Sequence, residues 1–139
     1  MAIYVREDIP SLAKNDNFPW NVEAILVEIN LRKAKLILVG AYHSTNKEYG
    51  CSDDVFLQHI GVMIDKYSSY DKFLIAGDLN MQEGQVVFDN FLEVHQAKNL
   101  VKEPTCYKSP QNPSCIDWIL TNRSSYFKNT KAIDNNYQS

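Results

Sequence analysis

A short apolar stretch that ends in Gly-Asp-Leu-Asn is the feature that most constrains this sequence. Residues 73–76 have the length and apolar character of a strand that is buried on both faces. Gly77 follows and allows the backbone to turn sharply. Asp78 and Asn80 then stand two residues apart at the carboxyl end of the strand, where ligands bind in open α/β sheets. A carboxylate and an amide at this edge suit a hard metal ion, a phosphate oxygen or an attacking water.

The same residues also have a purely structural interpretation. Asp and Asn side chains commonly accept or donate hydrogen bonds within their own turn, so Asp78 and Asn80 could simply stabilise the connection after the strand. Residues 74–80 alone support both interpretations, so the choice between them depends on the rest of the chain.

Size and composition predict one domain that spans residues 1–139. The chain is 45% hydrophobic, which is enough for a core, and no stretch approaches the roughly 20 apolar residues of a membrane span. The first residues show no basic segment followed by an apolar one, so we expect no signal peptide and an intracellular, nuclear or cytoplasmic location. Cys51, Cys106 and Cys115 form no paired framework and are expected to be free thiols; a zinc site lacks further ligands at suitable spacing.

The charge of the chain is unevenly distributed. The net charge of −3 argues against a simple electrostatic nucleic-acid binder. Residues 1–97 carry eight Lys and Arg against fourteen Asp and Glu, whereas residues 98–139 carry six against three. A basic tail of this kind could meet phosphates, but ordinary surface variation is the preferred explanation.

Hydrophobic periodicity predicts strands interrupted by two helices. Residues 22–30 and 35–42 form an antiparallel hairpin, and residues 53–66 form an amphipathic helix that begins after Ser52, with Asp53 and Asp54 in its first turn. A second helix is expected over 86–96, with further strands over 2–5, 73–76, 99–101, 116–121 and, more weakly, 126–133. The strands do not strictly alternate with helices, so the pattern favours an α+β layered sheet over a doubly wound one.

Two further strands carry a polar group where chemistry could take place. Tyr42 closes the strand over 35–42, and Asp117 interrupts an apolar strand near its start. A carboxylate in such a place is costly unless it has a partner. Asp117 could bond a neighbouring loop, or it could orient a histidine or hold a metal.

Several motifs follow one another along the chain. They are the opening Ala2-Ile3-Tyr4-Val5-Arg6-Glu7-Asp8-Ile9-Pro10, Gly40-Ala41-Tyr42, Ile75-Ala76-Gly77-Asp78-Leu79-Asn80, Pro104-Thr105 and Ser114-Cys115-Ile116-Asp117-Trp118-Ile119-Leu120. In this order they resemble the endonuclease/exonuclease/phosphatase superfamily, and in particular the endonuclease domains of non-LTR retrotransposons, which are relatives of the apurinic/apyrimidinic endonucleases. The resemblance implies a four-layered α/β sandwich, with two mainly antiparallel sheets packed face to face and helices outside.

The resemblance also implies a function, namely hydrolysis of DNA phosphodiesters with Mg²⁺ or Mn²⁺ by the endonuclease of a retrotransposon-like element. Asp78 would orient or deprotonate the attacking water or bind the metal, and Asn80 would hold a phosphate oxygen and complete a partial metal site. Tyr42 would donate a hydrogen bond near the scissile phosphate, and Asp117 would pair with a catalytic histidine. Thr105 and Ser114 match positions that line the site and bind substrate.

Two parts of the family pattern are missing from the sequence. The Asn and the metal-binding Glu of the first strands would precede Ala2, and the final Ser-Asp-His motif would begin where the chain stops. We therefore expect a domain that is incomplete at both ends, with weak metal binding, very low activity by itself and an exposed sheet edge or face that favours association. A non-catalytic remnant of the domain, and a phosphatase or lipid phosphodiesterase of the same superfamily, are the alternatives.

Overall fold

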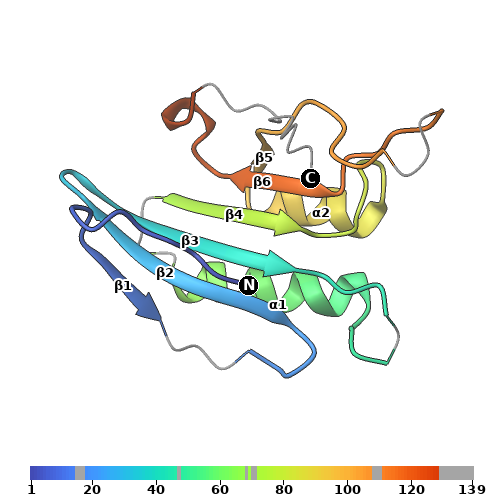
Figure 1. Cartoon of the computed structure of the whole chain (residues 1–139), viewed down its shortest axis with the longest axis horizontal. Coiled ribbons are helices and arrows are strands. Elements are labelled where there is room, and N and C mark those ends of the chain that lie inside the picture. The colour runs from blue at the N-terminus through green and yellow to red at the C-terminus, as the bar shows by residue number, and fades with distance from the viewer. Residues whose placement is uncertain (15–17, 47, 68, 70–71, 108–110, 129–139) are drawn as a thin grey trace, which may run out of the picture.

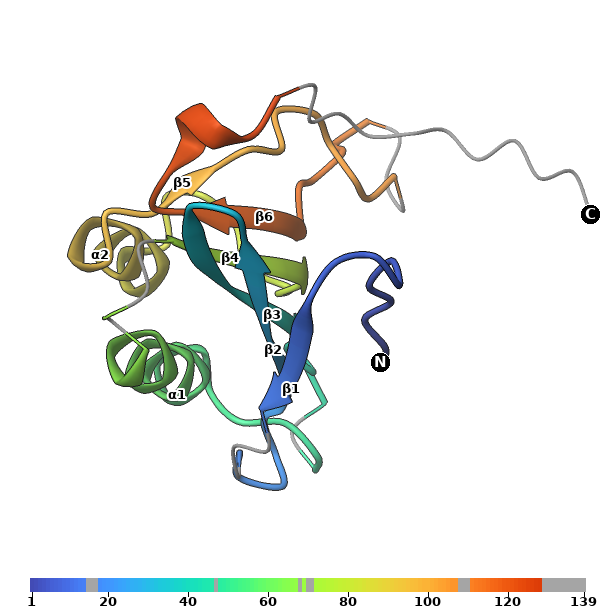
Figure 2. The same ribbon diagram turned by 90° about the vertical axis from the view of Figure 1, so that its left-hand side faces the viewer.

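A single mixed sheet with two helices on one face makes up the computed structural model, which describes residues 1–14, 18–46, 48–67, 69, 72–107 and 111–128 (Figures 1 and 2). The sheet has six strands in the order β1-β2-β3-β4-β6-β5. The elements are β1 (Ser11–Lys14), β2 (Glu23–Leu31), β3 (Ala34–Tyr42), α1 (Asp53–Lys66), β4 (Lys72–Asp78), α2 (Val86–Val94), β5 (Lys98–Asn99), β6 (Asp117–Thr121) and the 3₁₀ turn η1 (Ser124–Tyr126).

Antiparallel pairing dominates this sheet, as the sequence predicts for an α+β fold. β2 and β3 form the expected hairpin, and β1–β2, β4–β6 and β5–β6 are also antiparallel. β3 and β4 pair in parallel, because α1 carries the chain back to the start of β4. The polar residues that follow β3 and β4 consequently reach the same edge of the sheet.

The main core lies between the sheet and the two helices. Alternate residues of the strands point to this side, and each of them is almost completely buried; they include Ile37, Val39, Phe73, Ile75, Trp118 and Leu120. Phe56 and Ile60 of α1 and Phe88 and Phe91 of α2 close the core from outside. The helical spacing of the apolar residues in 53–66 thus predicted both the element and its buried face.

The other face of the sheet is apolar and only partly covered. Ile25, Leu38 and Leu74 occupy the alternate positions of β2, β3 and β4 and are half-buried. The N-terminal segment crosses this face at Gly40, where an added Cβ would lie 3.1 Å from Met1 Sδ and 3.3 Å from Ile3 Cδ1. Figure 2 shows this segment on the side opposite the helices. The described residues contain no second sheet.

The strand expected over 2–5 was wrong, the strand expected over 126–133 is described only at its first three residues, and β1 was missed. Residues 2–5 form no strand although their composition favours one; the chain becomes extended only at β1, which pairs with residues 26–29 of β2. Residues 124–126 form η1 and residues 127–128 form no strand; the rest of the strand expected over 126–133 lies outside the described residues. Both differences reflect the need for a partner strand, which a local pattern does not reveal.

No helix in the described part of the chain is long and apolar enough to cross a membrane.

Candidate functional site

Tyr42, Asp78 and Asp117 lie side by side at one edge of the sheet. Asp78 and Asp117 are directly paired residues of the antiparallel strands β4 and β6. Gly40 is in register with Ala76 in the parallel pair, so Tyr42 comes alongside Asp78, and the backbone N–H of His43 donates to the Asp78 carbonyl oxygen at 2.9 Å. All three side chains are on the face opposite the helices, because Ala41 and Trp118 beside them are buried in the helix-side core.

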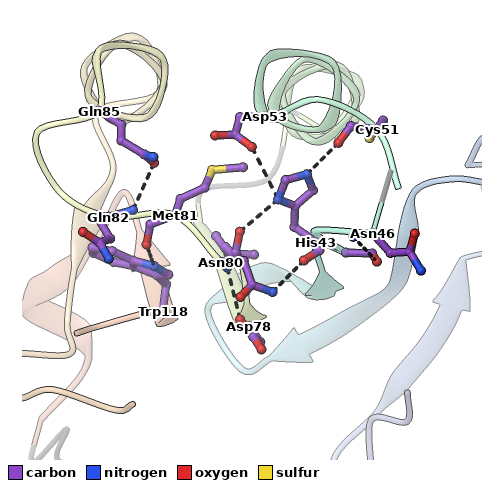
Figure 3. Close-up of polar contacts among 12 residues, drawn as sticks. His43, Asn46, Cys51, Asp53, Asp78, Asn80, Met81, Gln82, Gln85 and Trp118 are labelled. Carbon is purple, nitrogen blue, oxygen red and sulfur yellow. Dashed lines mark hydrogen bonds and ion pairs between the residues drawn. The ribbon is translucent and has the colours of Figure 1, made fainter. Parts of the chain in front are cut away.

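The loop after β4 is held by hydrogen bonds of both of its polar residues. The backbone N–H of Asn80 donates to Asp78 Oδ1 at 3.1 Å, and Asn80 Nδ2 donates to the His43 carbonyl oxygen at 2.8 Å (Figure 3). Asn80 adopts a left-handed conformation with φ of 51°, which Asn tolerates better than most residues. The turn interpretation of these residues is therefore correct in its geometry. It also fixes both side chains where the loops after β3 and β4 meet.

His43 has a structural place on the helix side of the sheet. Its ring is buried, with Nε2 2.9 Å from the Cys51 carbonyl oxygen and Nδ1 3.1 Å from the Leu79 carbonyl oxygen (Figure 3). The ring also packs on Phe56 of α1, with 4.7 Å between ring centroids. His43 thus ties the loops after β3 and β4 to the start of α1. It points away from the face that carries Tyr42, because it is the next residue of the chain and its ring is buried on the helix side.

The other two histidines belong to the helical layer. His59 lies within α1, and His95 follows α2, with its Nδ1 3.8 Å from Asp65 Oδ1. Neither is bonded to Asp117 within the described residues. The expected pairing of Asp117 with a catalytic histidine therefore stays a prediction.

Thr105 and Ser114 fasten the loop that leads into β6. Thr105 Oγ1 accepts hydrogen bonds from the backbone N–H groups of Ile116 at 3.2 Å and Asp117 at 3.1 Å. The Ser114 carbonyl oxygen accepts from the N–H groups of Thr105 and Cys106. These contacts set where Asp117 begins the strand. A direct contact of Thr105 or Ser114 with substrate stays a prediction.

Glu23 is a neighbour of the site that the sequence analysis did not single out. It pairs with Tyr42 in the β2–β3 register and lines the same cavity of about 640 Å³ as Tyr42, Asp78, Met1 and Ile3. The signal in the sequence was its place at the first residue of the hairpin, directly across from the end of β3. Glu23 was not predicted as a site residue because it matches no motif of the superfamily.

The carboxylates at this edge could hold a divalent metal only with help from other groups. Within the described residues, no group of three or more His, Cys, Asp or Glu side chains is close enough to bind a metal ion. Asp78 and Asp117 nevertheless provide two oxygen-donor side chains on neighbouring strands. Mg²⁺ is commonly held by one or two carboxylates together with waters and substrate phosphates. The donor set fits that mode of binding and does not fit a tightly held resident metal.

The thiol of Cys115 donates to the Asp117 carbonyl oxygen at 3.4 Å, and its surroundings favour the protonated form. Burial raises the pKa of its thiol, and the negative charges of Glu83 and Asp117 raise it further against the opposing hydrogen bond with Thr105. Cys51, beside His43, likewise has a pKa raised by burial, with Asp54 and Asp53 adding to the effect. Both are free thiols, as expected.

Several solved structures share this fold. The endonuclease domain of TRAS1, a telomere-specific non-LTR retrotransposon, is 18% identical with a TM-score of 0.64, covering 81% of this chain and 54% of that domain. Beta toxin from Staphylococcus aureus, a double mutant with bound magnesium ions, is 16% identical with a TM-score of 0.58, covering 81% and 47%. An endonuclease/exonuclease/phosphatase family protein from Leptotrichia buccalis is 17% identical with a TM-score of 0.51, covering 71% and 40%. No protein-family model and no curated protein matches the sequence.

These likenesses agree with the resemblance seen in the sequence motifs. The chain shares its fold with part of an endonuclease/exonuclease/phosphatase family protein and part of a non-LTR retrotransposon endonuclease domain. It spans about half the length of that endonuclease domain.

Proposed function

We propose that this chain is part of a metal-dependent phosphodiesterase domain that cleaves DNA. The alignment of Tyr42, Asp78 and Asp117 on one face and at one edge of three neighbouring strands carries the proposal. Two carboxylates and a phenol side by side do not stabilise the fold at the end of apolar strands. The two negative charges repel each other, and each carboxylate must stay hydrated. A phosphodiester with its metal and attacking water would engage all three of these groups at once.

The donor and acceptor groups of each side chain suggest its role in this reaction. The carboxylate of Asp78 accepts a hydrogen bond from the attacking water and takes up its proton. One N–H of the Asn80 amide is used on the His43 carbonyl, and the second N–H donates to a phosphate oxygen. The Tyr42 hydroxyl donates to another phosphate oxygen. Asp78, Asn80 and Asp117 would hold Mg²⁺ or Mn²⁺, which when bound neutralises charge on the phosphate.

The exposed apolar face supports a larger domain than the described residues form. Half-buried Ile25, Leu38 and Leu74 present a surface of the kind that a second sheet covers in a sandwich. We infer that a second, face-to-face sheet completes a four-layered architecture in the whole domain. Without that sheet the face promotes association between copies.

DNA is the proposed substrate because a retrotransposon endonuclease domain shares the fold over most of this chain. A phosphatase or a lipid phosphodiesterase of the superfamily would use the same edge residues, so these do not separate the substrates. Because we expect very low activity from this chain by itself, any cleavage should be slow and should act on plasmid, without hydrolysis of an inositol phosphate or a sphingolipid.

A non-catalytic remnant is the second candidate, and one observation favours it. Asp78 and Asn80 both use side-chain atoms to hold their own loop, and no group of three metal-ligating side chains is present in the described residues. A loop of this kind would persist after activity was lost, because it stabilises the junction of β3 and β4.

A plasmid-nicking assay separates these candidates. The chain is incubated with supercoiled plasmid and Mg²⁺ or Mn²⁺, with EDTA as the metal-free condition, beside Asp78→Ala and the matched surface control Glu93→Ala on α2. Metal-dependent nicking that disappears in Asp78→Ala and persists in Glu93→Ala supports the nuclease. Equal nicking by the wild type and Asp78→Ala contradicts it. Complete absence of nicking supports the non-catalytic candidate.

A further inference from the structure

We propose that the groove between α1 and α2 binds a basic amphipathic helix of a partner protein. The two helices lie side by side on the outer face of the molecule (Figure 2). A cavity of about 410 Å³ runs between them, with an apolar lining of Leu57, Gly61, Val62, Val87, Phe91 and Val94. This surface is on the side of the sheet opposite the face that carries Tyr42 and Asp78, so the inference does not depend on the proposed function.

Three exposed valines of the groove are not explained by the core. Val62 is 54% exposed, Val87 41% and Val94 75%, while the floor residues Leu57 and Phe91 are buried. Single exposed apolar residues are common on proteins. These three come from two helices and converge on one depression, which is the arrangement of a contact surface.

Gly61 makes the floor of the groove possible. A Cβ at this position would lie 2.9 Å from His95 Nε2 and 3.9 Å from Phe91 Cε2, so a larger residue would displace the His95 ring. The His95 and Phe91 rings thus lie directly against the α1 backbone at Gly61. Leu57 and Phe91, which are 4% and 7% exposed, form the floor between the exposed valines.

Charge identifies the kind of partner. Asp54 and Asp65 of α1 both line the groove, and eleven residues of helix separate them by about 16 Å. The two helices together carry five acidic residues against one basic residue, namely Asp53, Asp54, Asp65, Asp89 and Glu93 against Lys66. The Ser52 hydroxyl lowers the pKa of Asp54, which keeps this carboxylate charged. A cationic partner fits this surface, whereas an acidic one or a nucleic acid does not.

The shape of the groove favours a helix as the occupant. Two helices that lie side by side form a trough that accepts the apolar stripe of a third helix, with anchors spaced at i, i+3 or i+4, and i+7. Lys or Arg near both ends of that stripe would meet Asp54 and Asp65. The proposed partner therefore has apolar residues along one face and basic residues about eleven positions apart.

The test measures binding of a fluorescein-labelled amphipathic peptide with leucines on one face and arginines at both ends. The control peptide has glutamate in place of arginine. Fluorescence anisotropy is recorded with the wild type, with Val62→Ser/Val94→Ser and with Asp54→Asn/Asp65→Asn. Urea unfolding of each variant confirms that it is folded, which is expected because the substituted side chains are largely exposed.

The basic peptide is expected to bind, and the acidic peptide is not. The double serine variant should weaken binding by at least about 10-fold through lost apolar contact. The double asparagine variant should weaken it by about 5-fold and reduce its salt dependence. Lack of binding by the basic peptide, equal binding of the acidic peptide, or unchanged affinity in both folded variants would each overturn the proposal.

Discussion

Gly77 of β4 lies against the backbone of Ala41 in β3, so closely that a Cβ on Gly77 would be 1.8 Å from the Ala41 carbonyl oxygen. The φ angle of Gly77 is +153°, a conformation that residues with side chains rarely adopt. The two strands therefore meet at their carboxyl ends only because this position is glycine. The close approach brings Tyr42 and Asp78, the next residue of each strand, to the same edge.

Replacing Gly77 with alanine is expected to destabilise the protein strongly. The added methyl group meets the backbone of a neighbouring strand, which cannot move without breaking the parallel pairing, and the conformation itself is strained. We expect Gly77→Ala to lower the free energy of unfolding by about 3 kcal/mol or more, measured by urea denaturation.

Gly84→Ala is the matched control for that substitution. Gly84 also has a positive φ, of 88°, but an added Cβ would have no atom within 4 Å. Gly84→Ala should lower the free energy of unfolding only through backbone strain, by about 1 kcal/mol. Similar costs at the two positions would mean that contact with Ala41 does not explain the need for glycine at position 77.

Thr105 is expected to matter through its hydroxyl oxygen, which accepts two backbone N–H groups at the start of β6. Thr105→Val keeps the shape and removes the acceptor, leaving the N–H groups of Ile116 and Asp117 without it. A loss of about 1–3 kcal/mol in the free energy of unfolding is expected. Thr105→Ser keeps the oxygen and should retain most of the stability. If urea denaturation gives the same free energy of unfolding for Thr105→Ser and Thr105→Val, the two hydrogen bonds do not contribute to stability.

Local patterns in the sequence were sufficient for elements that carry their own signal. The helix over 53–66 and the hairpin of β2 and β3 follow from the spacing of their apolar residues. This spacing predicts the element whichever part of the chain packs against it. The mainly antiparallel sheet also follows, because the helices are too few to connect every strand in parallel.

Features that depend on distant contacts could not be predicted in the same way. Residues 2–5 have strand-like composition but no partner strand, whereas β1 is a strand because β2 presents a free edge to it. The same limit applied to the site. The motifs indicated Tyr42, Asp78 and Asp117, but the place of Glu23 opposite Tyr42 follows only from the register of the hairpin.

The raised pKa of Cys115 predicts how its reactivity depends on pH. Burial and the nearby carboxylates disfavour the thiolate in the folded protein, so its pKa exceeds the ordinary value of 9.0 that applies in the unfolded chain. In Cys51→Ser/Cys106→Ser, where Cys115 is the remaining cysteine, alkylation by iodoacetamide should be slower in the folded protein than in urea. The rate should also reach its half-maximal value at higher pH in the folded protein. Because the folded state holds this proton more tightly, stability should fall as pH rises through 9. Identical pH profiles in buffer and in urea would show that the surroundings of Cys115 do not disfavour its thiolate.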